Sequence, residues 1–194
     1  METGIRNKTL YGRESDYLKK IMVIGISAGA GKSTFARKLG EKTGIEVHHL
    51  DVLFWKPCWM ESDLHEFSIA QRELVNKKRW IIEGNYSNTF EIRANACDTV
   101  IYLELPLCLC LFRVLKRWLT NLGKTRPDMA AGCKEKMDWK FIRFILTTYG
   151  SRKKKMAERL ARFAAEGKEV IVLKSKPEID SYIEDLDFTA GHVS

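Results

Sequence analysis

The sequence lacks an apolar leader, a membrane-length apolar run and any internal repeat or low-complexity tract. Residues 1–20 alternate charges without an apolar core, which excludes a secretory signal and predicts a variable N-terminal extension. The most apolar stretch, residues 99–115, is shorter than a membrane span and is interrupted by Glu104, Pro106 and Arg113. These absences favour a protein that neither enters nor crosses a membrane.

Paired cysteines with zinc-site spacing are also absent. The five cysteines are odd in number, which favours free, reduced thiols and a cytoplasmic location. At 194 residues the chain can bury one sizeable core, so we expect a single domain over residues 21–190. The cysteines are Cys58, Cys97, Cys108, Cys110 and Cys133.

Residues 21–34 form an apolar strand that runs into a glycine-rich loop and an amphipathic helix. Gly29 and Gly31 have no Cβ, so their backbone N–H groups can approach phosphate oxygens. Lys32 supplies a catalytic cation for the β- and γ-phosphates of ATP, and the Ser33 hydroxyl can bind Mg²⁺. The predicted nucleotide-binding residues are Ala28, Gly29, Ala30, Gly31, Lys32, Ser33 and Thr34.

The loop departs from the usual phosphate-binding pattern at one position. Ile26 stands where that pattern places its first glycine, and Gly25 comes one residue earlier. Because the first glycine mainly lets the chain leave the strand, residues 29–34 can still form the phosphate cradle.

Strands and helices alternate along the rest of the chain, which predicts an α/β fold with a parallel sheet. Further strands are expected at residues 47–50, 80–83, 100–105 and 170–173. The carboxyl ends of parallel strands meet at one edge. We therefore expect the loop to face one crevice with Asp51, Glu83 and Glu104.

Three segments in this order resemble the adenylate-kinase-like nucleoside and nucleotide kinases, and most nearly their branch labelled "DNA topology modulation protein". They are His-Leu-Asp-Val-Leu-Phe-Trp-Lys-Pro (49–57), Trp-Ile-Ile-Glu-Gly-Asn-Tyr (80–86) and Gly-Lys-Thr-Arg-Pro-Asp (123–128). The resemblance implies a three-layer P-loop NTPase fold whose five-stranded parallel sheet has the order 2-3-1-4-5 and is flanked by helices. It also implies a lid insertion near residues 118–138 and phosphoryl transfer from Mg²⁺-bound ATP.

In such kinases an acid followed by glycine at the end of the third strand holds Mg²⁺ through water, and Glu83-Gly84 is similar to that pair. Glu104 is the competing candidate. The Phe-Pro-Arg of monophosphate kinases is replaced here by Asn85, Tyr86 and Ser87. This change favours a nucleoside or another hydroxyl compound as acceptor, bound by Gly84, Asn85 and Tyr86, unless Arg93 or Arg72 replaces the missing arginine.

Asp51 follows the second strand, where kinases of this architecture place an acid that orients or deprotonates the acceptor hydroxyl. The alternative for Asp51 is a helix cap. Trp55 and Tyr86, with neighbouring aromatic residues, could stack on an acceptor base or pack in the core.

Phosphoryl transfer needs cations around the transferring group. Arg113 and Arg117 are four residues apart on one helical face, and Arg126 lies in the insertion. Arg117 and Arg126 are the predicted catalytic arginines, with a solvent-facing position as the alternative, above all for Arg113.

Basic residues gather in residues 113–168, which contain sixteen Lys or Arg and five Asp or Glu. This region suits a polyphosphate ligand or the backbone of DNA. The function predicted is a kinase for a small acceptor. The alternatives are a nucleotide-dependent DNA-binding protein or an NTPase without a small acceptor.

Overall fold

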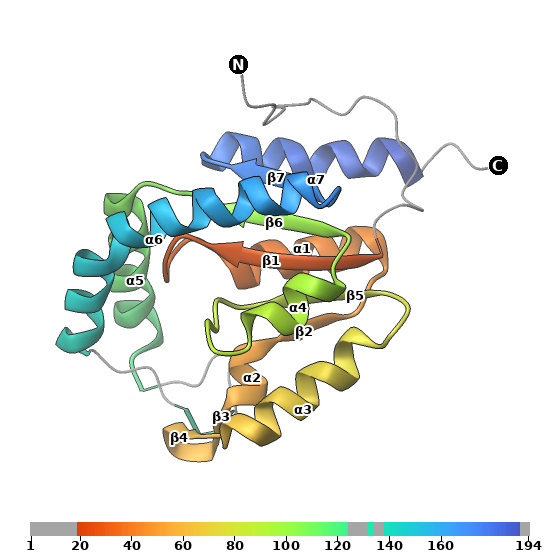
Figure 1. Cartoon of the computed structure of the whole chain (residues 1–194). Coiled ribbons are helices and arrows are strands. Elements are labelled where there is room, and N and C mark those ends of the chain that lie inside the picture. The colour runs from red at the N-terminus through yellow and green to blue at the C-terminus, as the bar shows by residue number, and fades with distance from the viewer. Residues whose placement is uncertain (1–18, 124–131, 134–137, 191–194) are drawn as a thin grey trace.

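The computed structural model describes residues 19–123, 132–133 and 138–190 (Figure 1). Its centre is a parallel sheet in the order β2-β5-β1-β6-β7. Counted among these five strands, this is the predicted order 2-3-1-4-5. The strands are β1 (Lys20–Gly25), β2 (Val47–His49), β5 (Trp80–Glu83), β6 (Thr99–Leu103) and β7 (Glu169–Leu173).

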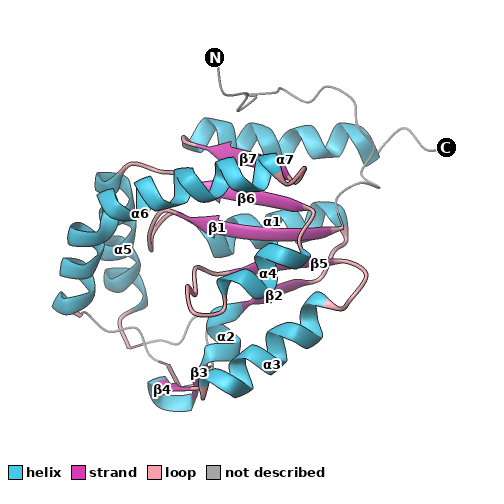
Figure 2. Cartoon of the chain, viewed as in Figure 1, coloured by secondary structure: helices cyan, strands magenta, loops and turns pink. Residues whose placement is uncertain are grey.

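Helices cover both faces of this sheet (Figure 2). The first and last helices, α1 and α7, pack together on one face, whereas α4 and α6 lie on the other. The helices are α1 (Lys32–Thr43), α2 (Leu50–Phe54), α3 (Leu64–Val75), α4 (Phe90–Ala96), α5 (Leu107–Asn121), α6 (Trp139–Ala165) and α7 (Lys176–Ala190).

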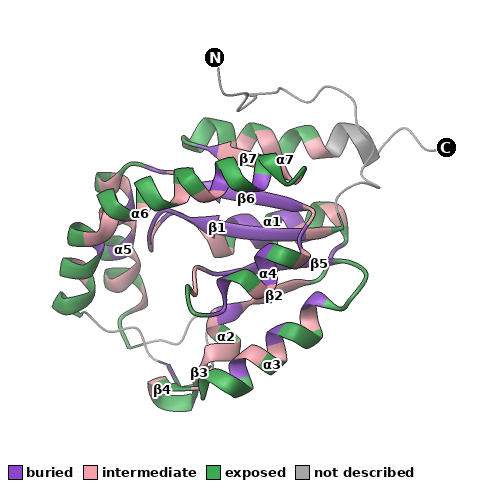
Figure 3. Cartoon of the chain, in the orientation of Figure 1, coloured by how far each residue is buried: buried purple, intermediate pink, exposed green. Residues whose placement is uncertain are grey.

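The core lies around β1, β5 and β6, whose residues are buried almost without exception (Figure 3). These strands have helices on both faces, which is why their sequences are nearly continuous apolar runs instead of alternating patterns. Within the described residues, no helix is both long enough and apolar enough to cross a membrane.

Several boundaries differ from those expected from sequence. The second strand ends at His49, and Leu50 already begins α2. The fourth strand runs from Thr99 to Leu103. A small antiparallel hairpin of β3 (Trp55–Lys56) and β4 (Met60–Glu61), joined by a 3₁₀ turn over Pro57–Trp59, was not expected. Helix α5 continues to Asn121. Residues 118–121, which were expected to begin the insertion, therefore belong to this helix.

Candidate functional site

The glycine-rich loop connects β1 to α1, as expected. Gly29 and Gly31 have φ values of 78° and 88°, which favour glycine over residues with a Cβ. Helix α1 follows directly, and no side chain caps its N-terminus. The first N–H groups of a helix have no partner within the helix, so this end is suited to bind an anion.

Helix α5 lies directly against the loop. A Cβ on Gly29 would stand 2.1 Å from the carbonyl oxygen of Cys110. A Cβ on Gly31 would stand 3.3 Å from Nη1 of Arg113, so this guanidinium group lies at the loop. Arg117 is half-buried one turn further along α5, whereas Arg126 lies outside the described residues. The solvent-facing alternative considered for Arg113 is therefore not what the structure shows.

Glu83 lies at the end of β5, beside the start of α1. Ser33 donates a hydrogen bond from Oγ to Oε2 of Glu83 over 3.2 Å. The ammonium nitrogen of Lys32 is 3.8 Å from Oε1 of the same carboxylate, whose side chain is 4 % exposed. A hydroxyl and a carboxylate are ligands that Mg²⁺ accepts, so this pair fits the predicted magnesium site.

Glu104, the competing candidate, faces a different neighbour. One of its carboxylate oxygens lies 3.0 Å from Nζ of Lys153 on α6. The two acids therefore have different partners, and the contact with Ser33 favours Glu83 over Glu104 as the candidate Mg²⁺ ligand. His49 adds a further contact that the sequence did not suggest, because its Nδ1 lies 3.0 Å from Oε2 of Glu83.

Asp51 lies in the first turn of α2 and is held by Tyr86. The Tyr86 hydroxyl donates a hydrogen bond to Oδ1 of Asp51 over 2.6 Å. Burial, and next the carboxylate of Asp51, raises the pKa of Tyr86 well above its ordinary value. Tyr86 therefore stays a neutral donor that orients Asp51, and the predicted acceptor residues Asp51 and Tyr86 lie together.

Most of the aromatic residues near Trp55 and Tyr86 pack against one another in a cluster. The ring centroids of Phe54, Phe67 and Tyr86 lie 4.8 to 5.1 Å from one another. Trp55 extends this cluster to Trp59, at 5.1 Å from Phe54 and 5.2 Å from Trp59. Phe67 is buried, whereas Trp55, like Phe54, Trp59 and Tyr86, is half-buried.

Asn85 was expected to bind the acceptor, but its side chain is occupied by the glycine-rich loop. Its Oδ1 accepts from the backbone N–H of Gly25 at 3.0 Å, and its Nδ2 donates to the Gly25 carbonyl at 2.7 Å. The side chain of Asn85 therefore connects the segment after β5 to the start of the loop. Gly84 packs against Leu50, where a Cβ would stand 2.8 Å from the Leu50 Cβ.

Arg93 was expected on a helix surface or as a replacement for the missing phosphate-binding arginine, and it is neither. Its side chain is completely buried, and it donates to the carbonyl oxygens of Tyr86 and Thr89 and to the side chain of Gln71. Burial lowers its pKa to about 10. Arg93 therefore fixes the segment that follows β5 from within.

The basic run on α6 is partly used inside the molecule. Arg152 stacks over Phe144 at 4.5 Å, and Lys153 pairs with Glu104. Arg152 is half-buried, whereas Lys153, Lys154 and Lys155 remain exposed.

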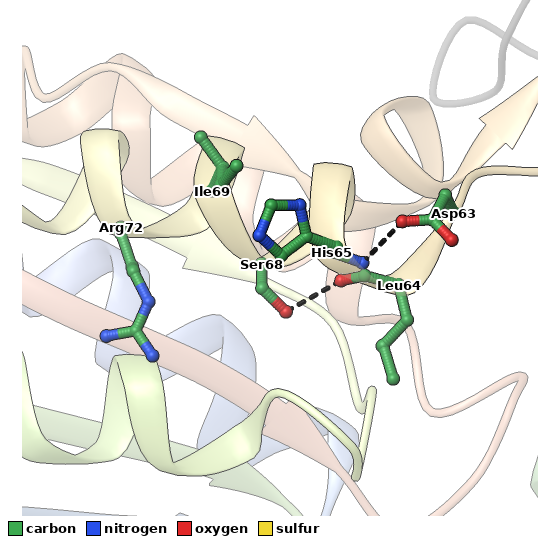
Figure 4. A pocket seen from close by; sticks show the side chains of 6 residues that line it. All are labelled: Asp63, Leu64, His65, Ser68, Ile69 and Arg72. Atoms are coloured by element: carbon green, nitrogen blue, oxygen red, sulfur yellow. Dashed lines mark hydrogen bonds between the residues drawn. The ribbon is translucent and has the colours of Figure 1, made fainter.

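A surface hollow on α3 lies apart from these residues (Figure 4). Asp63 caps this helix by accepting from the N–H groups of His65 and Glu66, and Ser68 donates to the Leu64 carbonyl. All of its lining residues come from one short stretch, and neither the loop nor Glu83 or Asp51 contributes. They are Asp63, Leu64, His65, Ser68, Ile69 and Arg72.

Comparisons with known proteins identify the fold. No family model matches the chain. Shikimate kinase from Acinetobacter baumannii, solved in complex with shikimate, is 19% identical with a TM-score of 0.50, covering 91% of this chain and 96% of that one. A gluconokinase from Sinorhizobium meliloti 1021 is 11% identical with a TM-score of 0.49, covering 91% and 93%. The chain thus shares the fold of that shikimate kinase.

One sequence match adds to this. A uridine kinase from Haemophilus ducreyi is 27% identical over 81 residues, which are 42% of this chain and 37% of that enzyme.

Proposed function

We propose that this protein is a kinase that transfers the γ-phosphoryl group of Mg²⁺-bound ATP to a hydroxyl of a small uncharged acceptor, of the nucleoside class. The observation that carries the proposal is the convergence of Lys32 and Ser33 on Glu83 at the N-terminus of α1. Asp51 and Tyr86 are joined by a hydrogen bond. They follow β2 and β5, the two strands on one side of β1.

Each residue has a role in this proposal. Lys32 and the N–H groups of the loop bind the phosphates, while Ser33 and Glu83 hold Mg²⁺ directly or through water. Bound Mg²⁺ neutralises phosphate charge and orients the transferring group. Asp51 accepts the proton of the acceptor hydroxyl, and Arg113 and Arg117 stabilise the negative charge that develops on the phosphoryl oxygens.

An uncharged acceptor is supported by the contacts of Arg93. Its guanidinium group is buried and bonded to Gln71 and to backbone carbonyls, so it does not serve a phosphate or a carboxylate of the acceptor. Trp55 in the aromatic cluster suits a flat ring, and the partial match to a uridine kinase nominates a nucleoside.

The test combines ligand binding with turnover. Mg²⁺-bound ATP at 100 times its dissociation constant stabilises a protein by about 2.7 kcal/mol, which a thermal-shift screen detects. Nucleosides, nucleoside monophosphates, shikimate, gluconate and short duplex DNA are screened with it, and each stabilising compound is then assayed as acceptor. We expect a nucleoside to be phosphorylated.

Lys32→Ala should reduce this turnover by roughly 10²-fold or more. Lys38→Ala, an exposed lysine on the same helix, is the matched control and should retain activity. Intact acceptor phosphorylation in Lys32→Ala would refute the proposal. ATP hydrolysis that no acceptor accelerates would support an NTPase, and stabilisation by DNA alone would support a DNA-binding protein.

A further inference from the structure

Two cysteines that are far apart in the sequence come together beside the β3–β4 hairpin. Cys58 lies in the turn of the hairpin, and Cys133 lies in the short described piece between α5 and α6, which is drawn next to β4 in Figure 1. A Cβ on Gly132 would stand 3.7 Å from Sγ of Cys58 and 3.6 Å from its backbone nitrogen. The thiol of Cys133 donates to the carbonyl oxygen of Lys56 at 3.5 Å. The sulfur of Cys133 therefore lies at Lys56, two residues before Cys58, and the residue that precedes Cys133 lies beside the sulfur of Cys58.

The two thiols differ in exposure in a way that suits a reactive pair. Cys58 is exposed, whereas Cys133 is 1% exposed beneath the hairpin. A dissolved oxidant therefore reaches Cys58 first, and Cys133 needs to reach only the sulfur of Cys58. In contrast, Cys97 and Cys110 are both buried and bonded to carbonyl groups of their own surroundings, those of Ala94 and Leu105.

The backbone of the turn adds an independent observation. Cys58 and Trp59 have φ values of 63° and 62°, so two successive residues with side chains adopt the left-handed conformation. This conformation is disfavoured for residues with a Cβ and persists only where the surroundings hold it. The T-shaped packing of Trp59 on Trp55 and the β3–β4 pairing hold it here and fix Cys58 beside Gly132.

We propose that Cys58 and Cys133 form a reversible intramolecular disulfide when the protein meets a low-molecular-weight disulfide of the glutathione type. The Cys58 thiolate attacks one sulfur of the small disulfide, which gives a mixed disulfide and releases one small thiolate. The Cys133 thiolate then attacks the Cys58 sulfur and expels the second small thiolate. Two protein thiols are oxidised, the small disulfide is reduced to two thiols, and the protons of the protein thiols pass to the released thiolates.

The bond would join the β3–β4 hairpin to the segment between α5 and α6. The hairpin contains Trp55 and follows the helix that carries Asp51. It would close a loop that contains α3, β5, α4, β6 and α5. A disulfide across so long a loop restricts the unfolded chain and so raises the melting temperature. The proposal does not depend on the proposed kinase function.

The test treats the full-length protein with oxidised glutathione and counts the remaining thiols. We expect at least two of the five thiols to be lost, one peptide linked through Cys58 and Cys133 in a non-reducing digest, and a melting temperature several degrees higher. Dithiothreitol should restore all five thiols and the original melting temperature.

Two variants complete the test. Cys58→Ser, a change at an exposed position, should form no intramolecular bond. Cys108→Ser removes another exposed cysteine and should still form it. The proposal is overturned if Cys58 stays as a glutathione adduct, if a different pair is linked, or if oxidation joins only separate molecules.

Discussion

The nucleotide side and the acceptor side of the candidate site are built in different ways. The phosphate cradle of the nucleotide side comes from one continuous stretch, residues 25–34, and consists largely of backbone at the start of a helix, to which Glu83 and Arg113 add side chains from elsewhere. The acceptor side combines side chains from α2, α3 and the segment after β5, which bond and pack against one another. A site made of contiguous backbone has a recognisable spacing, whereas one made of distant side chains has none until the chain folds.

The two sides are nevertheless connected through a few contacts. Asn85 bonds the backbone of Gly25, and His49 bonds Glu83. A change on the acceptor side can therefore reach the phosphate loop through these contacts. The following predictions separate the two sides.

The largest effect is expected from Gly29→Ala on the nucleotide side. The added Cβ would stand 2.1 Å from the Cys110 carbonyl, so the loop or α5 must move. We expect the thermal shift caused by Mg²⁺-bound ATP to disappear. The matched control is Gly44→Ala, because Gly44 also has a positive φ, of 64°, but has open space around it. This control should lose about 1 kcal/mol of unfolding free energy and keep the ATP-induced shift. Equal loss of that shift in both variants would contradict the packing argument.

The next largest effect is expected from Arg93→Met, beneath the acceptor segment. The substitution leaves the Gln71 side chain and two backbone carbonyls without their donor, which should lower the unfolding free energy by roughly 3 kcal/mol. Urea denaturation measures the loss. Arg72→Met, at an exposed position on α3, should change stability by less than about 0.5 kcal/mol. Similar stabilities for the two variants would show that the buried network contributes little.

A smaller and more selective effect is expected from Tyr86→Phe. The ring stays in its cluster, but Asp51 loses a hydrogen bond of 2.6 Å. We expect kcat/KM for the acceptor to fall by about tenfold, the equivalent of one hydrogen bond, while ATP binding is unchanged. Tyr102→Phe is the control, since the buried Tyr102 hydroxyl has no hydrogen-bond partner among the described residues. A loss that affects ATP binding equally would place Tyr86 on the nucleotide side.

The smallest effect concerns His48 on the edge strand β2. Burial lowers the pKa of His48, and the carboxylate of Glu46 opposes this. In the unfolded chain His48 therefore binds a proton more tightly than in the folded chain. The stability that neutral His48 contributes to the fold is present above the ordinary pKa of 6.5 and decreases as the pH falls below it. His48→Gln should flatten the dependence of the urea midpoint on pH between about 7 and 5. An unchanged slope would assign that dependence to other groups.

Much of the fold and of the nucleotide side followed from the sequence. Apolar runs placed the strands, and their alternation with helices predicted a parallel sheet. The strand order, which the family resemblance implied, is confirmed. A strand was predicted at residues 80–83, and β5 has these same bounds. The β3–β4 hairpin was missed because each of its strands has two residues, too few to show a period of two.

The acceptor side was predicted only as a set of residues. The sequence indicated that Asp51, Trp55 and Tyr86 lie near one another, but not that Tyr86 holds Asp51 or that Asn85 binds Gly25. It also left Glu83 and Glu104 open, because both end an apolar strand. In the structure their partners differ: Glu83 meets Ser33 on α1, and Glu104 meets Lys153 on α6.

The sequence by itself determined where the strands lie and where the phosphate loop lies, because hydrophobic periodicity and glycine spacing act over a few neighbouring residues. Tertiary structure alone decided which acid meets Ser33, that Arg93 is buried, that Arg113 reaches the loop and that Cys58 lies beside Gly132. These outcomes depend on contacts between residues far apart in the chain, and such contacts are fixed only when helices pack on the sheet.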